Sequence, residues 1–494
     1  MSIKRFVKKI QNIMRKDPNI DGDAQRLTQI SWLLFLKSFQ IIENNLGRDK
    51  TTSSLTKVAF ANESGDKIIA DDLRWQTWTK DVQNDDLETL TSINNNLFLP
   101  LQKIIVDTSD KTRESEQRII QQIFSSLDQL ICSPTVLSEL IDVIDNQFTQ
   151  EFSAKTHLIG DIYETILGDL RSAGNAGEFY TPRPITRFMV EMLQPKIGEI
   201  IMDPACGTGG FLLDVMKYLR EHNPEIDDMK ELNKTIRGVE KKKYPYQLCL
   251  TNMMLNNLTS ISDIRLDNLL QYNLDSHPNE IDKFLSNPPF GGHEERRISV
   301  NFPEQLYSRD TADLFLVLMM KLLKDGGQAA VILPNGFLFG EGVKTRIKIK
   351  LLAENDLHTI IRLPTSVFSP YTNVATNILF FEKGKPTSKI WFHDLVFPDH
   401  IKSFSKSNPI TDECFSEIKN WWSERRESTN AWTVNLEQLK ANNYNLDLLN
   451  PNTVEEKYDL QKLFDDDKKQ SNDIQKILER LKQTFLHHLK DEFK

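Results

Sequence analysis

A short loop carries the residue types best suited to chemistry in this chain, Asn287-Pro288-Pro289-Phe290, with Gly291-Gly292 directly after it. The two prolines hold the backbone extended and offer carbonyl oxygens without competing N–H groups. Asn287 adds a side-chain carbonyl, and Phe290 adds an aromatic face. Together they suit a planar amino group, whose protons need acceptors and whose ring needs a stacking partner.

The amino group of adenine is such a target, and it is a poor nucleophile because its lone pair is delocalised into the ring. Acceptors outside the ring plane, Asn287 Oδ1 and the Pro288 carbonyl, would localise that pair and stabilise positive charge as the nitrogen attacks a methyl group. A base in a duplex must flip out to reach such a loop, and Phe290 would then stack on it. An ordinary turn after a strand is the alternative interpretation.

A second segment, Asp203-Pro204-Ala205-Cys206-Gly207-Thr208-Gly209-Gly210-Phe211, is typical of a strand, a tight glycine turn and a helix. Glycines allow positive φ and a close approach of backbone N–H groups to a ligand, and the helix starting near Gly210 adds its dipole. The segment is not a P-loop, because no Lys-Ser/Thr pair follows. A purely structural turn remains open.

Two acidic residues follow the next strands. Glu240 ends the second strand, where a carboxylate can accept both hydroxyls of a ribose. Asp267 follows the third strand and could receive an adenine amino group. The alternatives are a solvated acid beside the lysines at 241–243 for Glu240 and a helix N-cap for Asp267.

The elements that position these residues alternate between strands and helices from about 155 to 385. We expect strands at 200–202, 235–240, 263–266, 283–286, 328–333, 359–363 and 375–381. This alternation predicts an α/β fold with a doubly wound, mostly parallel sheet. Ligands of such sheets bind beyond the carboxyl ends of the strands, where all these motifs fall.

The flanking sections differ from this pattern. Residues 1–150 predict a helical domain, with apolar spacing typical of helices at 27–42, 119–131 and 136–148 and a polar loop at 44–66. Residues 386–494 form a C-terminal extension whose last part, 474–493, carries an apolar stripe at helical spacing. That amphipathic helix either docks on a partner subunit or folds back on its own domain.

Composition narrows the class of protein. The formal net charge is −9, from 61 Lys and Arg against 70 Asp and Glu, which disfavours coating nucleic acid by bulk charge but leaves room for a local basic groove. Four scattered cysteines and nine histidines without clustering predict neither disulfides nor a metal site. Residues 1–17 lack the apolar stretch of a secretory signal, and Trp32 to Leu36 is too short to span a bilayer, so a cytoplasmic protein is expected.

Two basic stretches near these motifs remain open. His293 and the arginines at 296 and 297 follow the Asn287 loop and could contact phosphates. Lys344, Arg346, Lys348 and Lys350 form another basic run. Solvated charged surface is the alternative for both stretches.

In this order, the motifs resemble those of S-adenosylmethionine-dependent amino-methyltransferases of DNA, and most closely the modification (M) subunit of type I restriction–modification systems. Segments 331–336 and 370–378 resemble two further blocks of the family, and 32–37 is similar to an N-terminal block of this subunit. The resemblance implies N6-methyladenine in double-stranded DNA as the product. It implies catalysis by Asn287, Pro288, Pro289 and Phe290. It implies a cofactor site built from Glu178, Phe179, Tyr180, Thr181, Pro182, Arg183, Asp203, Gly207, Thr208, Gly209, Gly210, Glu240 and Asp267.

The resemblance also implies partners. In the family, a separate specificity (S) subunit reads the DNA sequence, commonly with two M subunits per S, and a restriction (R) subunit adds cleavage. Two other hypotheses are a protein glutamine methyltransferase, which solves the same electronic problem for an amide nitrogen, and a non-catalytic scaffold.

Overall fold

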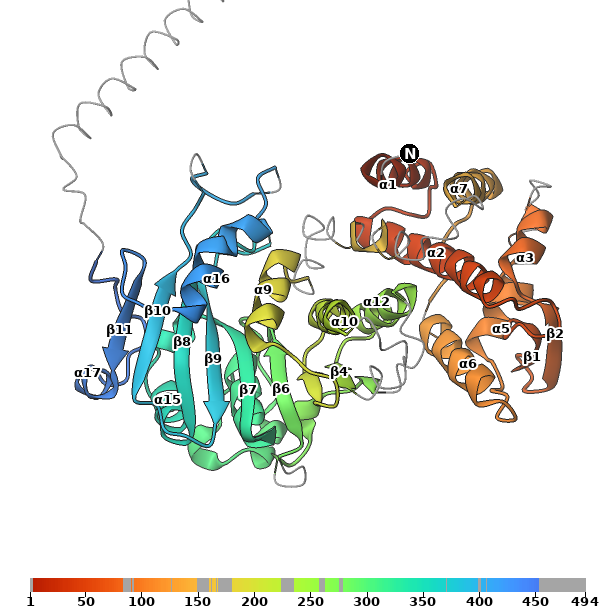
Figure 1. Ribbon diagram of the computed structural model, residues 1–494. Coiled ribbons are helices and arrows are strands. Elements are labelled where there is room, and N and C mark those ends of the chain that lie inside the picture. The colour runs from red at the N-terminus through yellow and green to blue at the C-terminus, as the bar shows by residue number, and fades with distance from the viewer. Residues whose placement is uncertain are drawn as a thin grey trace, which may run out of the picture.

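The computed structural model describes residues 3–82, 90, 93–125, 127–148, 160, 162–165, 167, 180–223, 235–256, 263–274, 279–369, 371–398, 401–405 and 407–452. Figure 1 shows two regions, a mostly helical N-terminal section and a section built around a large sheet. The apolar stripe at 474–493, and with it the predicted docking helix, lies outside the described residues.

The N-terminal section consists of α1 (Ile3–Met14), α2 (Asp23–Asn45), β1 (Thr56–Ala61), β2 (Lys67–Asp72), α3 (Trp75–Val82), η1 (Asn94–Phe98), α5 (Leu99–Gln102), α6 (Lys111–Phe124) and α7 (Pro134–Gln147). Helices α2 and α7 confirm the predictions from apolar spacing. Helix α7 starts where the Ser-Pro pair indicates, since the Ser133 hydroxyl accepts a hydrogen bond from the Val136 amide at 3.3 Å.

Two local predictions in this section are wrong. The predicted loop at 44–66 contains β1, which pairs antiparallel with β2. Thr56, Val58 and Phe60 are buried at every second position, a strand period that the polar residues around it obscure. Helix α6 ends at Phe124 rather than near 131, because the chain turns there and the Leu127 amide donates to the Phe124 carbonyl at 3.0 Å.

The second section contains α9 (Arg183–Leu193), β3 (Ile201–Asp203), α10 (Gly210–His222), β4 (Ile236–Glu240), α12 (Lys243–Leu255), β5 (Ile264–Leu266), β6 (Ile281–Ser286), α13 (Thr311–Leu322), β7 (Leu323–Pro334), α14 (Asn335–Phe339), α15 (Val343–Glu354), β8 (Asn355–Leu363), β9 (Thr376–Lys383), β10 (Lys389–Asp394), α16 (Ser416–Ser423), β11 (Ala431–Asn435) and α17 (Leu436–Ala441). Short 3₁₀ turns lie at 269–271, 296–301, 304–306 and 412–415. All seven predicted strands are present.

The strands form one nine-stranded sheet in the order β11-β10-β8-β9-β7-β6-β3-β4-β5. Strands β5, β4, β3, β6 and β7 run parallel, and β9 is antiparallel to its neighbours β7 and β8. The chain proceeds from β3 to β4 and β5 on one side and continues with β6 on the other. The crevice for a ligand is therefore expected beside β3.

The sheet does not end where the predicted C-terminal extension begins. Strand β10 pairs parallel with β8, and β11 pairs antiparallel with β10, so the sheet continues to Asn435. Two strands of the section after residue 385, β10 and β11, thus belong to the same sheet as β3, β4 and β6. The domain boundary at residue 385 stays a prediction.

Helices cover both faces of the sheet. Helices α9, α10 and α12 contact one face, and α13 and α15 contact the other. Strand β7 shows the alternation that this burial requires, since Ala330 and Ile332 join one apolar core while Ala329 and Val331 join the other. The layers hold the carboxyl ends of the strands at one edge of the sheet.

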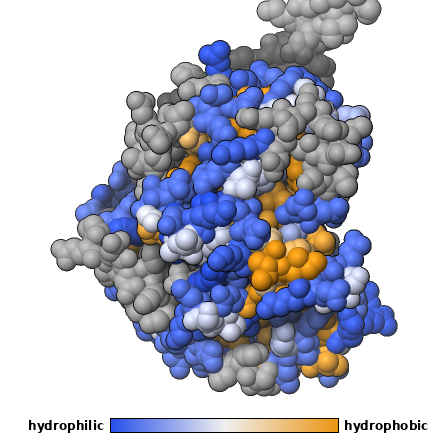
Figure 2. Space-filling model, turned by 90° about the vertical axis from the view of Figure 1, so that its right-hand side faces the viewer, coloured by the Kyte–Doolittle hydropathy of each residue, from blue (hydrophilic) through white to orange (hydrophobic). Residues whose placement is uncertain are grey.

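The N-terminal section packs against α12 of the sheet section. The Gln247 amide donates to the Ile123 carbonyl at 3.2 Å, and the Ser31 and Tyr163 hydroxyls lie 3.2 Å apart. The outward face of the N-terminal section is mostly hydrophilic, with one larger apolar area (Figure 2). Within the described part of the chain, no helix is both long and apolar enough to cross a bilayer.

Candidate active site

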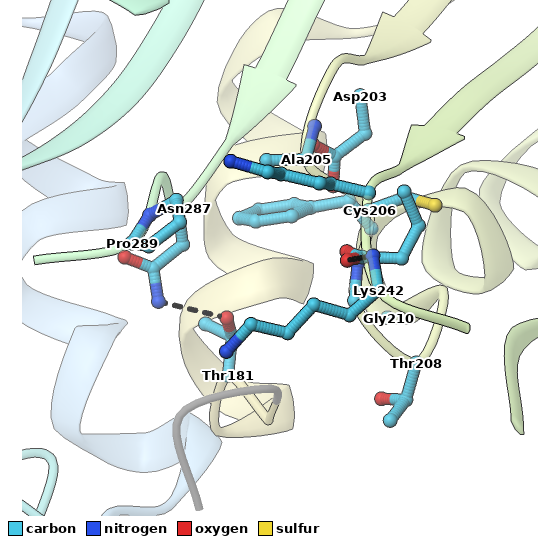
Figure 3. A pocket seen from close by; sticks show the side chains of 13 residues that line it. Thr181, Asp203, Ala205, Cys206, Thr208, Gly210, Lys242, Asn287 and Pro289 are labelled. Carbon is cyan, nitrogen blue, oxygen red and sulfur yellow. Dashed lines mark hydrogen bonds between the residues drawn. The ribbon is translucent and has the colours of Figure 1, made fainter. Parts of the chain in front are cut away.

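A pocket opens at the carboxyl ends of β3, β4 and β6, the three neighbouring strands that end in Asp203, Glu240 and Ser286 (Figure 3). Its empty volume, including the mouth, is about 660 Å³. It is lined by Thr181, Asp203, Ala205, Cys206, Gly207, Thr208, Gly210, Phe211, Glu240, Lys241, Lys242, Asn287 and Pro289. The fold therefore brings the glycine turn, the acid after the second strand and the Asn-Pro-Pro loop into one cavity.

The glycine turn between β3 and α10 needs its glycines for conformation and for space. Gly207 and Gly209 have φ of 54° and 81°, in the left-handed region. A Cβ on Gly210 would lie 1.7 Å from Nη1 of Arg183, a buried guanidinium. The turn is thus closely packed from behind while its other side faces the pocket.

Glu240 is held at the pocket by backbone donors. Its two carboxylate oxygens accept hydrogen bonds from the Gly207 amide at 3.0 Å and the Lys242 amide at 2.7 Å. Burial raises the pKa of Glu240, although these hydrogen bonds act in the opposite direction. The carboxylate therefore ties the end of β4 to the glycine turn and retains lone pairs for a ligand.

Asp203 links the turn to the catalytic loop. Its carboxylate accepts hydrogen bonds from the Ser286 hydroxyl at 2.8 Å and the Ala205 amide at 3.1 Å. Burial raises the pKa of Asp203 to about 7. Ser286 was missed by the sequence analysis, although its place directly before Asn287 at a strand end was a usable signal.

The two polar atoms of the Asn287 side-chain amide differ in their hydrogen bonding. Its Nδ2 donates to Thr181 Oγ1 at 3.0 Å (Figure 3), and its buried Oδ1 has no hydrogen-bond partner among the described residues. A buried carbonyl without a donor is unfavourable by about 1–3 kcal/mol. Asn287 therefore lines the pocket with an amide that Thr181 holds in place and whose acceptor no described residue satisfies.

The rest of the loop surrounds that acceptor. Pro288 is buried, and Pro289 is exposed at the pocket. The ring of Phe290 is half-buried and meets Phe368 edge to face, with ring centroids 6.0 Å apart and an interplanar angle of 79°. A face of Phe290 not covered by that contact would suit a planar base.

The segment predicted to hold the methionine end of a cofactor is divided. Thr181 lines the pocket, and Pro182 caps α9. Arg183 instead lies behind the glycine turn, where its guanidinium pairs with Glu164 and lies 5.0 Å from the ring centre of Tyr180. Arg183 therefore supports the turn, while Glu178 and Phe179 lie outside the described residues.

Asp267 is not among the residues that line the pocket. Its carboxylate accepts a hydrogen bond from the Tyr272 hydroxyl at 2.6 Å, and its backbone amide donates to the Glu240 carbonyl at 2.9 Å. The neighbouring Asn268, rather than Asp267, caps the following 3₁₀ turn by accepting from the Leu270 amide. A contact between Asp267 and a cofactor stays a prediction.

Other pocket residues were missed as members of the site. Phe211, Lys241 and Lys242 line it, and their positions directly after the turn and after Glu240 were the available signal. Cys206, which the sequence analysis leaves without a partner, lies with its sulfur 4.0 Å from that of Cys249. This neighbouring thiol and burial hold the pKa of Cys206 well above its ordinary value, so it is no nucleophile.

Two lysines of the basic run at 344–350 are engaged within the fold, whereas Arg346 is exposed. Lys344 forms ion pairs with Asp310 at 2.7 Å and Asp313 at 2.6 Å. Lys348 is buried and donates to the Leu338 carbonyl at 2.7 Å. These two lysines stabilise the fold and are not exposed to a phosphate backbone.

Comparisons with known proteins agree with this geometry. A family model described as N-6 DNA methylase matches residues 154–459, and one described as HsdM N-terminal domain matches residues 3–144. The methylase subunit of the type I restriction enzyme EcoEI from Escherichia coli is 44% identical over 459 residues, which cover 91% of each chain.

Solved structures show the same relationship. A modification subunit of a type I restriction enzyme from Vibrio vulnificus superimposes with a TM-score of 0.75 at 34% identity, covering 92% of this chain and 97% of that one. A chain from a structural study of complex assembly in a type I restriction–modification system gives a TM-score of 0.75 at 32% identity, covering 97% of both. The chain belongs to the N-6 DNA methylases, in the branch formed by the methylase subunits of type I restriction enzymes.

Proposed function

We propose that this methylase uses S-adenosylmethionine to methylate the N6 amino group of adenine in double-stranded DNA, within a cytoplasmic complex. A specificity subunit would supply sequence recognition, with two methylase subunits for each, and a restriction subunit would add cleavage. The observation that carries the chemical part concerns Asn287, which lines the same pocket as Asp203 and Glu240 and whose buried Oδ1 has no partner in the described part of the chain.

The residues that line the pocket support S-adenosylmethionine as the methyl donor. The glycine turn leaves room for close approach along one wall, and Glu240 retains acceptor capacity for ribose hydroxyls. Thr181 and Asp203 offer polar groups to the methionine end. Asp267 does not line the pocket, so the amino group of the cofactor's adenine would reach it only by extending past the lining residues. When bound, the cofactor supplies an electrophilic methyl group.

The catalytic contribution of the chain is electrostatic. Asn287 Oδ1 and the Pro288 carbonyl would accept the two N–H groups of the adenine amine, draw its lone pair out of the ring and stabilise the positive charge that develops on nitrogen. Thr181 fixes the amide of Asn287 so that the oxygen faces the substrate. Phe290 would stack on the flipped base, and Phe368 supports that ring from its edge.

The test is transfer of tritiated methyl from S-adenosylmethionine by the full chain, purified with the specificity subunit of the same organism. Three methyl acceptors are compared. They are genomic DNA from a strain of the host that lacks this methylase complex, the same DNA methylated beforehand by the complex, and a denatured protein mixture. We expect label in the unmethylated DNA, recovered as N6-methyladenine after nuclease digestion. Label in protein only would establish the glutamine alternative, and absence of cofactor binding by calorimetry would establish a scaffold.

A further inference from the structure

The first helix concentrates positive charge in an acidic chain. Residues 3–16 contain no Asp or Glu and six cations, Lys4, Arg5, Lys8, Lys9, Arg15 and Lys16. The whole chain has a formal net charge of −9. The charge of α1 is therefore a local feature and does not follow from the composition.

The packing of α1 holds these cations outward. Phe6, Ile10 and Met14 are fully buried on one face of the helix, and all six cations are exposed. At about 1.5 Å per residue, the stretch from Lys4 to Lys16 spans about 18 Å. This is about the length of five base pairs of duplex DNA.

A groove lies between α1 and α7, and cations from residues 5–16 line one side of it. Its empty volume is about 1470 Å³. Its lining includes four cations, Arg5, Lys8, Lys9 and Lys16, and two carboxylates, Glu139 and Asp142. Lys16 pairs with Glu139 at 2.7 Å, which neutralises one carboxylate of the α7 side.

Arg5, Lys8 and Lys9 have no carboxylate at ion-pair distance in the part of the chain that the structure describes. Their charge is thus not used to stabilise the fold. A ligand with regularly spaced negative groups would neutralise these cations. The lysine content is unfavourable for the core of a protein–protein interface.

The position of α1 agrees with such a ligand. In Figure 1, α1 lies at the top of the N-terminal section, and the loop that follows β10 lies at the top of the sheet. Because β10 runs parallel to β8, and β8 and β7 have the same direction, this is also the edge at which β6 delivers Asn287.

We propose that the exposed face of α1 is a sequence-independent contact to the phosphate backbone of DNA, away from the flipped base. Arg5, Lys8 and Lys9 bind phosphates of the duplex that presents its adenine to the pocket. This inference rests on the proposed function for its substrate, and it adds a second surface that holds that substrate.

The test compares the full chain with the triple variant Arg5→Gln, Lys8→Gln and Lys9→Gln. Binding of a fluorescein-labelled 30-base-pair duplex is followed by anisotropy at several KCl concentrations. Each phosphate contact contributes about 0.9 to the slope of log affinity against log salt, so we expect a slope smaller by about 2–3 and affinity about 100- to 1,000-fold weaker at 0.1 M. An unchanged slope would overturn the proposal.

The matched control replaces Lys50, Lys67 and Lys103, three exposed lysines of the same section, with Gln. It changes the net charge equally, and its slope should remain that of the native chain. A loss of slope equal to that of the α1 variant would show a bulk-charge effect and contradict the proposal. Unaltered cofactor binding by the α1 variant is the check on folding.

Two further outcomes separate this inference from the proposed function. If the α1 variant binds DNA normally but no longer assembles with the specificity subunit, the surface is a protein interface and the inference is wrong. If the native complex transfers no methyl group to adenine, the proposed function fails, whereas the salt slopes still decide whether α1 contacts DNA.

Discussion

The two ends of the pocket are built differently. At the end of β4, both carboxylate oxygens of Glu240 accept hydrogen bonds from backbone amides, and the glycine turn is packed against Arg183. At the end of β6, Asn287 keeps a buried oxygen that has no partner among the residues that the structure describes. The first end is satisfied before any ligand arrives, and the second is complete only with a donor from outside.

This difference assigns cofactor binding to the Glu240 end of the pocket and methyl transfer to the Asn287 end. Backbone amides fix the Glu240 end, one from Gly207 in the glycine turn and one from Lys242 directly after β4, so little rearrangement is needed when a cofactor enters. The Asn287 end retains an unfavourable oxygen whose partner is supplied by the amine that reacts. We therefore expect substitutions at the two ends to act on different kinetic constants.

The largest effect is expected for Asn287→Ala. Methyl transfer in a single turnover should fall by about 100- to 1,000-fold, because Asn287 acts on charge that develops in the transition state. The dissociation constant of S-adenosylmethionine, measured by calorimetry, should change less than about threefold. Asn420→Ala, at an exposed asparagine of α16, is the control and should leave both unchanged. Turnover retained in Asn287→Ala would remove this residue from the mechanism.

Glu240→Ala should show the opposite distribution. We expect cofactor binding weaker by about 1–3 kcal/mol, or about 5- to 150-fold, because ribose hydroxyls and the Gly207 amide both lose an acceptor. The rate at saturating cofactor should change little. Glu240→Gln keeps an acceptor oxygen and should lie between the two. A native dissociation constant in Glu240→Ala would refute the ribose assignment.

Thr181→Val sharpens the comparison, because Thr181 was predicted at the cofactor but bonds to Asn287. Loss of one hydrogen bond of about 1 kcal/mol should lower the transfer rate about fivefold to tenfold, with a smaller change in cofactor affinity. Thr181→Ser restores the hydroxyl and should recover the rate. If affinity falls and the rate does not, Thr181 belongs to the cofactor end instead.

The smallest effect concerns Asp203 and pH. A carboxyl group whose pKa is about 7 in the folded chain and about 3.9 when unfolded holds its proton more tightly in the fold. Its ionisation therefore lowers stability as the pH rises from about 4 to about 7, with no further loss above. Asp203→Asn keeps an oxygen that accepts from Ser286 but cannot ionise.

The melting temperature of Asp203→Asn should therefore rise relative to that of the native chain between pH 5 and pH 7 and then stay level. A shift of about 2–4 °C corresponds to each kcal/mol. Asp128→Asn, at an exposed site, is the control and should follow the native chain throughout. Parallel melting curves for Asp203→Asn and the native chain would contradict a raised pKa.

Much of the sheet could be predicted because its signals are local. Each predicted strand coincides with a short apolar run bounded by turn residues, and the motifs lie at the strand ends where the fold places them. Strands β1, β2, β10 and β11 were not predicted. Their runs are short and interrupted by polar residues, and β10 and β11 gain their place from pairing with β8, which is a long-range contact.

The candidate site shows the same limit. Gly207, Glu240 and Asn287 were found as members of one pocket because each motif indicates its own strand end. Arg183 was assigned to the pocket but lies behind the turn, since its guanidinium finds Glu164 there. Lys348 was considered for a basic surface but is buried against the Leu338 carbonyl. The direction of a long side chain depends on partners that no local pattern reveals.

The amino-acid sequence by itself determined which chemical groups are available for the reaction and at which strand ends they lie. Strand periodicity, glycine spacing and the rigidity of consecutive prolines are properties of neighbouring residues, so they can be recognised without the fold. Only the tertiary structure decided that Thr181 orients Asn287 across 106 positions of chain and that Arg183 lies behind the glycine turn against Glu164. Those relations arise from the packing of segments that are distant in sequence, where burial and hydrogen bonding are optimised together.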